Sequence, residues 1–402
     1  MTFAEETMSL TRRTILLASA GTLSAPFILR SARAAEPIRF GWLVALTGAN
    51  SAPGVGYNRG VQWAAEQINA NGGVKGRKIE VITRDTQGDP TKAVNAAVEF
   101  ATRDKVHAVF GPTNSGEALA TTPILSRYKV PNMQQGVVDK LIDPEKYPYA
   151  FRNAATNTQW DDANRNYVVN VLKAKSVAIL GDNTGYGTTA TAASVAAFQK
   201  AGLTVAYNEV IDANAQDCAP SLLRARDAGA EAVVVWSDST GLDARMMNAR
   251  ARIGWNVVFA GHPAMGSGGV AKLLDKPSSW DNVYIIGYRP CTFDASGKLP
   301  ARTQDFVNSV KGKIELGDTS LWWVVAAVDA VNLVAAAVEK TGSSEPDAIA
   351  GYWNTLRDWP GLFGTYTFSP AQHNGYATEQ IVMSAANSQH DGAFSLAPGY
   401  AG

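Results

Sequence analysis

The chain has 402 residues, of which 46% are hydrophobic and 18% charged, so it has enough apolar material for two globular domains of ordinary size. Lys and Arg together number 36, and so do Asp and Glu. This balance excludes the basic excess that is typical of nucleic-acid-binding and polybasic membrane-surface proteins.

Residues 1–34 have the pattern of a signal peptide. Arg12-Arg13 precede the apolar run ILLASAGTLSAPFIL, and Ala32 and Ala34 form an A-x-A-like cleavage site. The apolar run has about 15 residues, fewer than the roughly 20 that a spanning helix needs, which disfavours the alternative of an uncleaved anchor. The paired arginines are typical of twin-arginine export, with the Sec route as the alternative. We expect cleavage near Ala34 and an exported protein.

Apolar β-rich runs alternate with helical patterns through residues 38–155. Strands are expected at 38–46, 78–85, 107–112, 130–135 and 150–155, and helices at 57–70, 89–103 and 116–128. This repeated βαβ pattern predicts a mostly parallel sheet with helices on both faces.

The pattern then restarts and gives a second α/β unit of similar size. Strands are expected at 176–182, 204–211, 231–238, 256–262 and 282–290, and helices at 160–174, 183–202, 218–230 and 240–254. Two long helices follow at 301–313 and 320–340, and residues 362–396 alternate like antiparallel strands with a tight turn. No Gly/Ser spacer separates the units, so we predict two hinged α/β lobes with a cleft between them.

The run Leu321–Val338 is long and apolar enough to suggest a membrane span. Asp329 and Asn332 lie near its middle, and a charged centre is costly in lipid. We predict a buried helix of a globular domain instead.

Ligands of open α/β sheets bind beyond the carboxyl ends of the strands, so the loops there hold the candidate residues. Ser115, in GPTNSGEA, lacks both flanking glycines of a nucleophile elbow. Glu117 stands where a phosphate-binding loop needs Lys. Two interpretations of Ser115 remain, a plain helix N-cap or a hydroxyl at a helix N-terminus that holds a carboxylate. Tyr186, between two glycines, either contacts a ligand or packs on its own helix.

The cysteines and histidines indicate no metal site. Cys218 and Cys291 are the only cysteines, and two small buried residues are the default expectation, with a disulfide as the alternative. The four histidines are scattered without metal-ligand spacing. We expect no metal and no cofactor.

Several motifs together resemble the periplasmic solute-binding proteins of the branched-chain amino acid ABC transporter class. They are IRFGWLVALTGANSAPG, INANGGVKGRKIEV, AVFGPTNSGEALATTPIL, AGAEAVVVW, DNTGYGTT and FSPAQHNGY. The resemblance spans residues 38–396 and implies a type I binding protein, with two Rossmann-like lobes joined by a three-crossover hinge. It implies residues 36–152 plus 289–360 in lobe 1, and residues 153–288 plus 361–398 in lobe 2.

The resemblance also implies a function in binding rather than catalysis. By this resemblance we expect a monomeric periplasmic protein that captures a small ligand and delivers it to membrane permease subunits, with ATPase subunits acting indirectly. In amino-acid binders of the class, a serine at the Ser115 position holds the carboxylate and a tyrosine at the Tyr186 position contributes from the other lobe. The candidate ligand-binding residues are Asn114, Ser115, Gly116, Gln135, Gly136, Trp160, Tyr186, Asp238 and His262.

The chain departs from the class at the ammonium side of the site. Gln135 and Gly136 replace a threonine, and His262 stands in a setting where the class has an acid, which leaves Asp238 as a compensating carboxylate or a loop cap. An ammonium group without a charge partner is costly in a closed site. We therefore expect a carboxylate-bearing ligand, either an amino acid or an aromatic carboxylate stacked on Trp160, Trp236 and Tyr186. A ligand-sensing partner of a receptor and an exported hydrolase are the alternatives.

Overall fold

The computed structural model describes residues 36–400 except 49–50 and 318. The predicted signal peptide and its cleavage near Ala34 lie outside the described residues and stay predictions. The chain divides into two units, Met1–Glu36 and Pro37–Gly402, and the elements below belong to the second unit.

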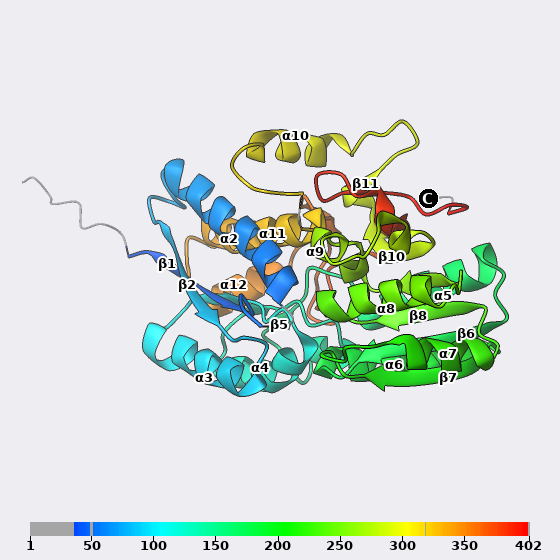
Figure 1. Cartoon of the computed structure of the whole chain (residues 1–402). Coiled ribbons are helices and arrows are strands. Elements are labelled where there is room, and N and C mark those ends of the chain that lie inside the picture. The colour runs from blue at the N-terminus through cyan, green and yellow to red at the C-terminus, as the bar shows by residue number, and fades with distance from the viewer. Residues whose placement is uncertain (1–35, 49–50, 318, 401–402) are drawn as a thin grey trace, which may run out of the picture. The chain divides into compact units, whose positions relative to one another are not determined.

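The first sheet is entirely parallel, with strand order β2-β1-β3-β4-β5. Its strands are β1 (Ile38–Val44), β2 (Ile79–Asp85), β3 (Ala108–Phe110), β4 (Asn132–Met133) and β5 (Ala150–Phe151). The helices between them are α2 (Ser51–Ala70), α3 (Pro90–Glu99) and α4 (Ser115–Arg127). Figure 1 shows these elements in blue and cyan.

The second sheet has strand order β14-β10-β9-β8-β6-β7, and only its edge strand β14 runs antiparallel. Its strands are β6 (Ser176–Asp182), β7 (Thr204–Ile211), β8 (Ala232–Trp236), β9 (Val258–Gly261), β10 (Val283–Tyr288) and β14 (Ile381–Ala385). Every residue of β8 is buried, as expected for a central strand covered on both faces. Its helices are α5 (Asn157–Asn166), α6 (Gly185–Lys200), α7 (Ala219–Asp227), α8 (Thr240–Arg252) and the short α9 (Gly268–Ala271). The predicted two-lobe α/β fold is confirmed.

Helices begin and end where the sequence provides caps. Asp89 accepts hydrogen bonds from the backbone of Thr91 and Lys92 at the start of α3, and Thr156 and Gln159 form a capping box at the start of α5. Single π-turns extend α3 (η1, Phe100–Asp104) and α5 (η3, Tyr167–Val171).

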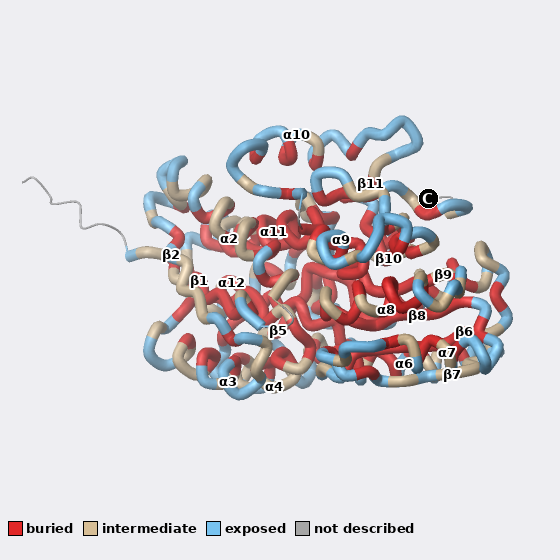
Figure 2. The backbone as a smooth tube through the Cα atoms, in the orientation of Figure 1, coloured by how far each residue is buried: buried red, intermediate tan, exposed pale blue. Residues whose placement is uncertain are grey.

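The apolar run 321–338 is the buried core helix α11 (Leu321–Thr341), as predicted. It packs on α2 and on α12 (Pro346–Trp353), and Figure 2 shows it buried along most of its length. Gly56 and Gly60 of α2 let the two helices approach closely, because a Cβ on Gly60 would meet the backbone carbonyl of Val324. The pattern that suggests a membrane span therefore reflects the middle of a protein core.

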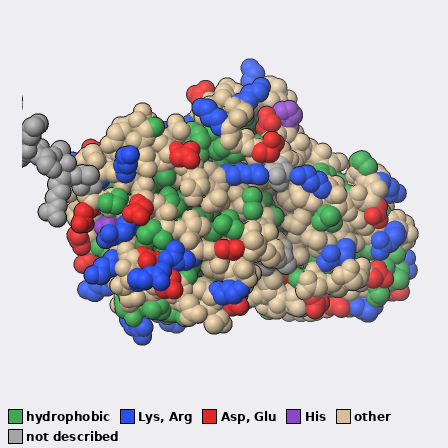
Figure 3. Space-filling view, turned by 60° about the vertical axis from the view of Figure 1, so that its left-hand side comes forward, with side chains coloured by type: hydrophobic (Ala, Val, Ile, Leu, Met, Phe, Trp, Pro, Cys, Tyr) green, Lys and Arg blue, Asp and Glu red, His purple; other side chains and the backbone are tan. Residues whose placement is uncertain are grey.

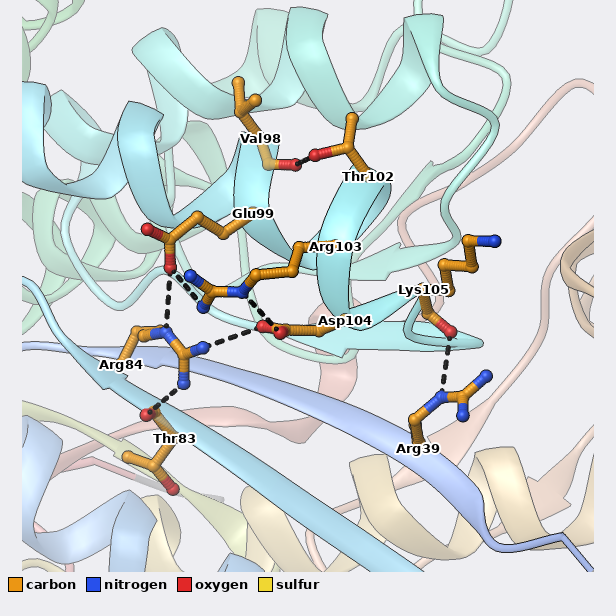
Figure 4. Close-up of polar contacts among 9 residues, drawn as sticks. All are labelled: Arg39, Thr83, Arg84, Val98, Glu99, Thr102, Arg103, Asp104 and Lys105. Carbon is orange, nitrogen blue, oxygen red and sulfur yellow. Dashed lines mark hydrogen bonds and ion pairs between the residues drawn. The ribbon is translucent and has the colours of Figure 1, made fainter.

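Four charged side chains form a closed ring of ion pairs beside η1 (Figure 4). Glu99 joins Arg84 (3.2 Å) and Arg103 (2.7 Å), while Asp104 joins the same two arginines at 2.7 Å and 3.0 Å. The ring fastens the end of α3 to β2. On the face shown in Figure 3, basic and acidic side chains are intermixed, which agrees with the balanced composition.

The structure corrects some predicted elements. Helix α2 begins at Ser51 rather than residue 57, because Pro53 fits the first turn of a helix and the glycines pack closely. Helix α12 has no counterpart among the predicted elements. The expected antiparallel end of the chain is partly right: β13 (Thr365–Tyr366) and β14 both pair antiparallel, but their partners, β12 (Trp359–Pro360) and β10, lie outside the predicted segment 362–396.

Three further elements lie outside the two sheets and the helices named above. They are α10 (Ala301–Val310), β11 (Thr292–Phe293) and β15 (Phe394–Ser395), the last two paired in parallel. Cys218 and Cys291 are buried and unpaired, as the default expectation had it. The residue boundaries of the two lobes stay a prediction.

Candidate functional site

A pocket lies where the carboxyl ends of strands from both sheets meet. The space enclosed by its lining residues is about 30 Å³, room for about two water molecules. The lining residues are Pro53, Tyr57, Thr113, Asn114, Ser115, Gln135, Val137, Trp160, Tyr186, Asp238, His262, Trp322 and Trp323. The pocket thus brings together seven of the nine predicted site residues, all except Gly116 and Gly136.

The start of α4 forms one corner of the pocket. The N-cap is Asn114, whose side-chain oxygen accepts a hydrogen bond from Gly116 N at 2.8 Å. Ser115 is the first residue of the helix, so the expectation that Ser115 is the cap is wrong. The reason is that Asn114 has the extended backbone of a cap and an equally suitable side chain.

Among the described residues, the Ser115 hydroxyl oxygen serves as a hydrogen-bond acceptor and its proton has no acceptor. Its oxygen accepts a hydrogen bond from the backbone N–H of Val137 at 3.1 Å. A hydroxyl has one proton to donate besides its acceptor capacity, so Ser115 keeps a donor for a ligand in the pocket.

Gln135 forms the wall next to Ser115. Tyr57 donates its hydroxyl to the Gln135 side-chain oxygen at 3.1 Å, and the Gln135 amide donates to Asn153 at 2.6 Å. Gly136 lies behind this wall, where a Cβ would come within 2.6 Å of Ala118. Gln135 is therefore held in place by the protein itself, and Gly136 serves close packing.

Tyr186 enters the pocket from the first turn of α6, where Thr184 is the N-cap. Its ring is buried, and its hydroxyl makes no hydrogen bond to any described residue. Burial raises the pKa of Tyr186 well above its ordinary value, so the hydroxyl stays protonated and can donate. A buried unpaired hydroxyl in a pocket suits a ligand acceptor.

Asp238 follows β8 and is the one acidic residue among those that line the pocket. Its Oδ2 accepts a hydrogen bond from the Asn114 amide at 3.0 Å, and its Oδ1 is buried without a partner among the described residues. Burial, and then the nearby carboxylate of Asp182, raise the pKa of Asp238 well above its ordinary value. A cationic group on a ligand would restore the charged form; without one the protonated form is favoured.

His262 faces the pocket as a neutral imidazole. Its Nδ1 accepts a hydrogen bond from Ala264 N at 3.2 Å, and burial lowers its pKa to about 3. The neutral ring then carries its proton on Nε2, which is a donor. Its ring centroid lies 5.3 Å from that of Trp160 and 4.9 Å from that of Tyr186.

Aromatic rings make up much of the remaining wall. Trp160 donates its indole N–H to Tyr288 at 2.7 Å, whereas the indole N–H of Trp322 is buried without a partner among the described residues. Trp236 is buried but does not line the pocket, so its expected stacking role is not supported by its position. Trp42 is also a core residue, stacked on Phe110.

Sequence reasoning missed Tyr57, Trp322 and Trp323 as pocket residues. All three lie on helices, outside the loops that follow strands. The adjacent tryptophans at the start of an otherwise aliphatic helix could have indicated the pocket. The middle of such a helix packs tightly in the core, whereas an end beside a cleft can hold large rings.

Gly116 lies at the edge of the cleft, where it contacts Gly185 of α6. The segment SPAQHNGY lies beside the end of β5: Arg152 N donates to His373 O and Gly375 N donates to Arg152 O, each at 2.9 Å. No group of three His, Cys, Asp or Glu side chains within the described ranges has a geometry suited to a metal ion.

The donors and acceptors define what the pocket can hold. Ser115, Tyr186 and Trp322 offer protons, while no Lys or Arg is present among the lining residues. Neutral donors in a buried site bind an anionic oxygen without the cost of burying a cation. Asp238, when it is ionised, offers a negative charge to a cationic group.

The profile of the periplasmic binding protein family matches residues 37–390. An amino acid binding protein of Pseudomonas aeruginosa is 31% identical over 46% of this chain, and that match spans only half the length of the relative. A Streptococcus pneumoniae structure, the substrate-binding protein LivJ of a branched-chain amino acid transporter with isoleucine, is 23% identical and has a TM-score of 0.77, covering 89% of this chain and 97% of its own. A solute-binding protein of Rhodopseudomonas palustris with 4-hydroxybenzoate is 21% identical and has a TM-score of 0.74, covering 89% and 95%.

Proposed function

Because the chain belongs to the periplasmic binding protein family, we propose that it binds a small carboxylate-bearing ligand between its lobes and delivers it to the permease of an ABC importer. The observation that carries this proposal is the set of buried donors around the pocket. The hydroxyls of Ser115 and Tyr186 come from opposite lobes, and the Tyr186 hydroxyl and the Trp322 indole N–H have no partner within the described part of the chain.

The carboxylate is proposed to lie at the start of α4. The helix dipole and the Ser115 hydroxyl favour a negative charge there, and a hydrogen bond to a charged group is stronger than one between neutral groups. The Tyr186 hydroxyl would contact the same group from the second lobe. A ligand bound in this way joins the two lobes.

The rest of the ligand is proposed to be an aliphatic or aromatic group among the rings of Tyr57, Trp160, Trp322 and Trp323. The chemistry of the lining residues suits two ligand classes. An amino acid would place its ammonium group at Oδ1 of Asp238, since His262 is neutral. An aromatic carboxylate has no ammonium group and would leave Asp238 protonated on Asn114.

Binding without turnover is part of the proposal. The bound ligand shifts the equilibrium between open and closed lobes toward the closed state. The size of this shift is set by the ratio of the ligand's affinities for the closed and the open state. The closed protein, a monomer outside the cytoplasmic membrane, then docks on permease subunits whose ATPases supply the energy. The predicted signal peptide is consistent with this location.

A thermal-shift panel tests the ligand class. Purified mature protein is mixed with the twenty amino acids, with benzoate and 4-hydroxybenzoate, and with small amides, and each hit is titrated by calorimetry. We expect hits among carboxylates and none among the amides. A response to leucine, isoleucine and valine alone would contradict the broader assignment, and hits among the amides alone would contradict the carboxylate.

A further inference from the structure

Two glycines from opposite lobes touch at the edge of the cleft. Gly116 is the second residue of α4 and Gly185 is the first residue of α6. A Cβ on Gly185 would lie 2.7 Å from the Cα of Gly116 and 3.2 Å from its N. These atoms belong to the backbone, so the clash cannot be relieved by turning a side chain.

The clash exists only when the lobes are together. Apart from its own helix and chain neighbours, the hypothetical Cβ of Gly185 meets no atom except those of Gly116. Gly185 is not among the described residues with positive φ, so alanine fits its backbone. Within its own lobe an alanine is therefore harmless, and in a helix it is preferred over glycine.

A direct hydrogen bond crosses the cleft beside the two glycines. Asn114 donates to Asp238 at 3.0 Å while its side-chain oxygen caps Gly116. The bond is buried and joins two protein side chains directly. One side chain thus ties the first turn of α4 to the end of β8.

We propose that Gly185 is a positioning residue: because it has no side chain, the lobes can approach at the backbone of Gly116 far enough for the Asn114–Asp238 bond, and this contact closes part of the protein population without ligand. The consequence for affinity rests on the function proposed above, whereas the closure of the free protein does not. Since only the closed state binds tightly, a smaller closed fraction lowers apparent affinity in proportion.

Distances between nitroxide labels on Lys92→Cys and Lys200→Cys, one site per lobe and both exposed, measure closure. We expect a closed population in the free parent protein. In Gly185→Ala the ratio of closed to open protein should fall about tenfold or more, because overpacking a tight contact is costly. Gly351→Ala is the matched control, because Gly351 lies in α12 with open space around it. It should close like the parent protein.

Two further variants keep the test independent of folding. Gly116→Ala places its Cβ 3.4 Å from the Cα of Gly185, an ordinary van der Waals contact, and 3.1 Å from Oδ1 of Asn114, so it should reduce closure less than Gly185→Ala. Asn114→Ala should reduce closure without a clash. Circular dichroism verifies that each folds. An entirely open free parent protein, or a Gly185→Ala variant that closes like its parent, would overturn the proposal. For any hit of the ligand panel, Gly185→Ala should weaken binding by a similar factor; a panel without hits would overturn the function and leave the closure result standing.

Discussion

The hydroxyl oxygen of Ser115 accepts a hydrogen bond from the backbone N–H of Val137, 3.1 Å away, which joins the loops that follow β3 and β4 on one wall of the pocket. The bond fixes the direction in which the Ser115 proton can point. Because the acceptor side of the hydroxyl is used by the protein, the remaining donor is directed to whatever fills the pocket.

Ser115→Ala tests this arrangement. We expect the affinity for a carboxylate ligand to fall about tenfold to a hundredfold, since a hydrogen bond to a charged group is worth about 1.5–3 kcal/mol. The free energy of unfolding should fall by only about 1 kcal/mol, because Val137 N loses its partner. Calorimetry and urea unfolding measure the two effects. Ser194→Ala, which removes a buried hydroxyl bound to Asp161 outside the pocket, should lower stability and leave affinity unchanged.

Trp322→Phe separates the ring from its N–H. The indole N–H is buried without a partner in the described part of the molecule, so its removal should leave the free protein as stable or slightly more stable. If the N–H serves the ligand, affinity should fall about tenfold while a ring remains to fill the space. Thermal unfolding and calorimetry on one preparation check both. A loss of stability without loss of affinity would assign Trp322 to packing alone.

Asp238→Asn distinguishes the two ligand classes. The asparagine keeps an oxygen for the Asn114 amide but cannot pair with an ammonium group. Phenylalanine should lose about tenfold to a hundredfold in affinity, and 3-phenylpropionate, which lacks the amine, should bind as before or better. Parallel titrations of the two compounds give the answer, and equal losses for both would refute a role for Asp238 at the ammonium.

The sequence allowed the fold to be predicted nearly element by element, because strands such as β6 and β8 have clear apolar runs bounded by turn residues. The pocket loops were also predictable, since parallel strands place their carboxyl ends together. The partners within the site were not. That Asn114 rather than Ser115 caps α4, and that Asp238 meets Asn114, depends on backbone angles and on the approach of two lobes that no local pattern encodes.

Packing between helices was equally hidden from the sequence. The glycines that precede Gly60 favour a loop when only local propensity is considered. For this reason the predicted start of α2 lies too late in the chain. Their real role appears only when α11 lies against them.

Gly60→Ala measures that role. Alanine is usually favoured over glycine inside a helix by about 0.5–1 kcal/mol. Here its Cβ would meet the carbonyl of Val324 and lie 2.9 Å from the Cβ of Ala327, so we expect a net loss of about 1–3 kcal/mol in the free energy of unfolding. Urea unfolding checks this. The same exchange at Gly351, where nothing lies within 4 Å, should be neutral or stabilising.

Glu117 gives the protein a predictable pH dependence. Its side chain is fully buried in the first turn of α4, and burial, with smaller contributions from Asp89 and Asp85, raises its pKa to about 7. In the unfolded chain the pKa is 4.5, so between these values the folded state holds a proton that the unfolded state has lost. Stability from this group is therefore complete below about pH 4.5 and is lost as pH rises to about 7.

Glu117→Gln removes this titration and retains a similar shape. We expect the variant to gain stability relative to the parent protein as pH rises from 5 to 8, by an amount of order 2–3 kcal/mol, because each unit of pKa shift is worth about 1.4 kcal/mol. Burial also raises the pKa values of Asp161 and Asp329 to about 6, and both groups change stability equally in the parent protein and the variant. The difference between the two free energies of unfolding, followed against pH, therefore reports the titration of Glu117 alone. A difference that stays constant from pH 5 to 8 would show that Glu117 is ionised in the folded protein throughout that range.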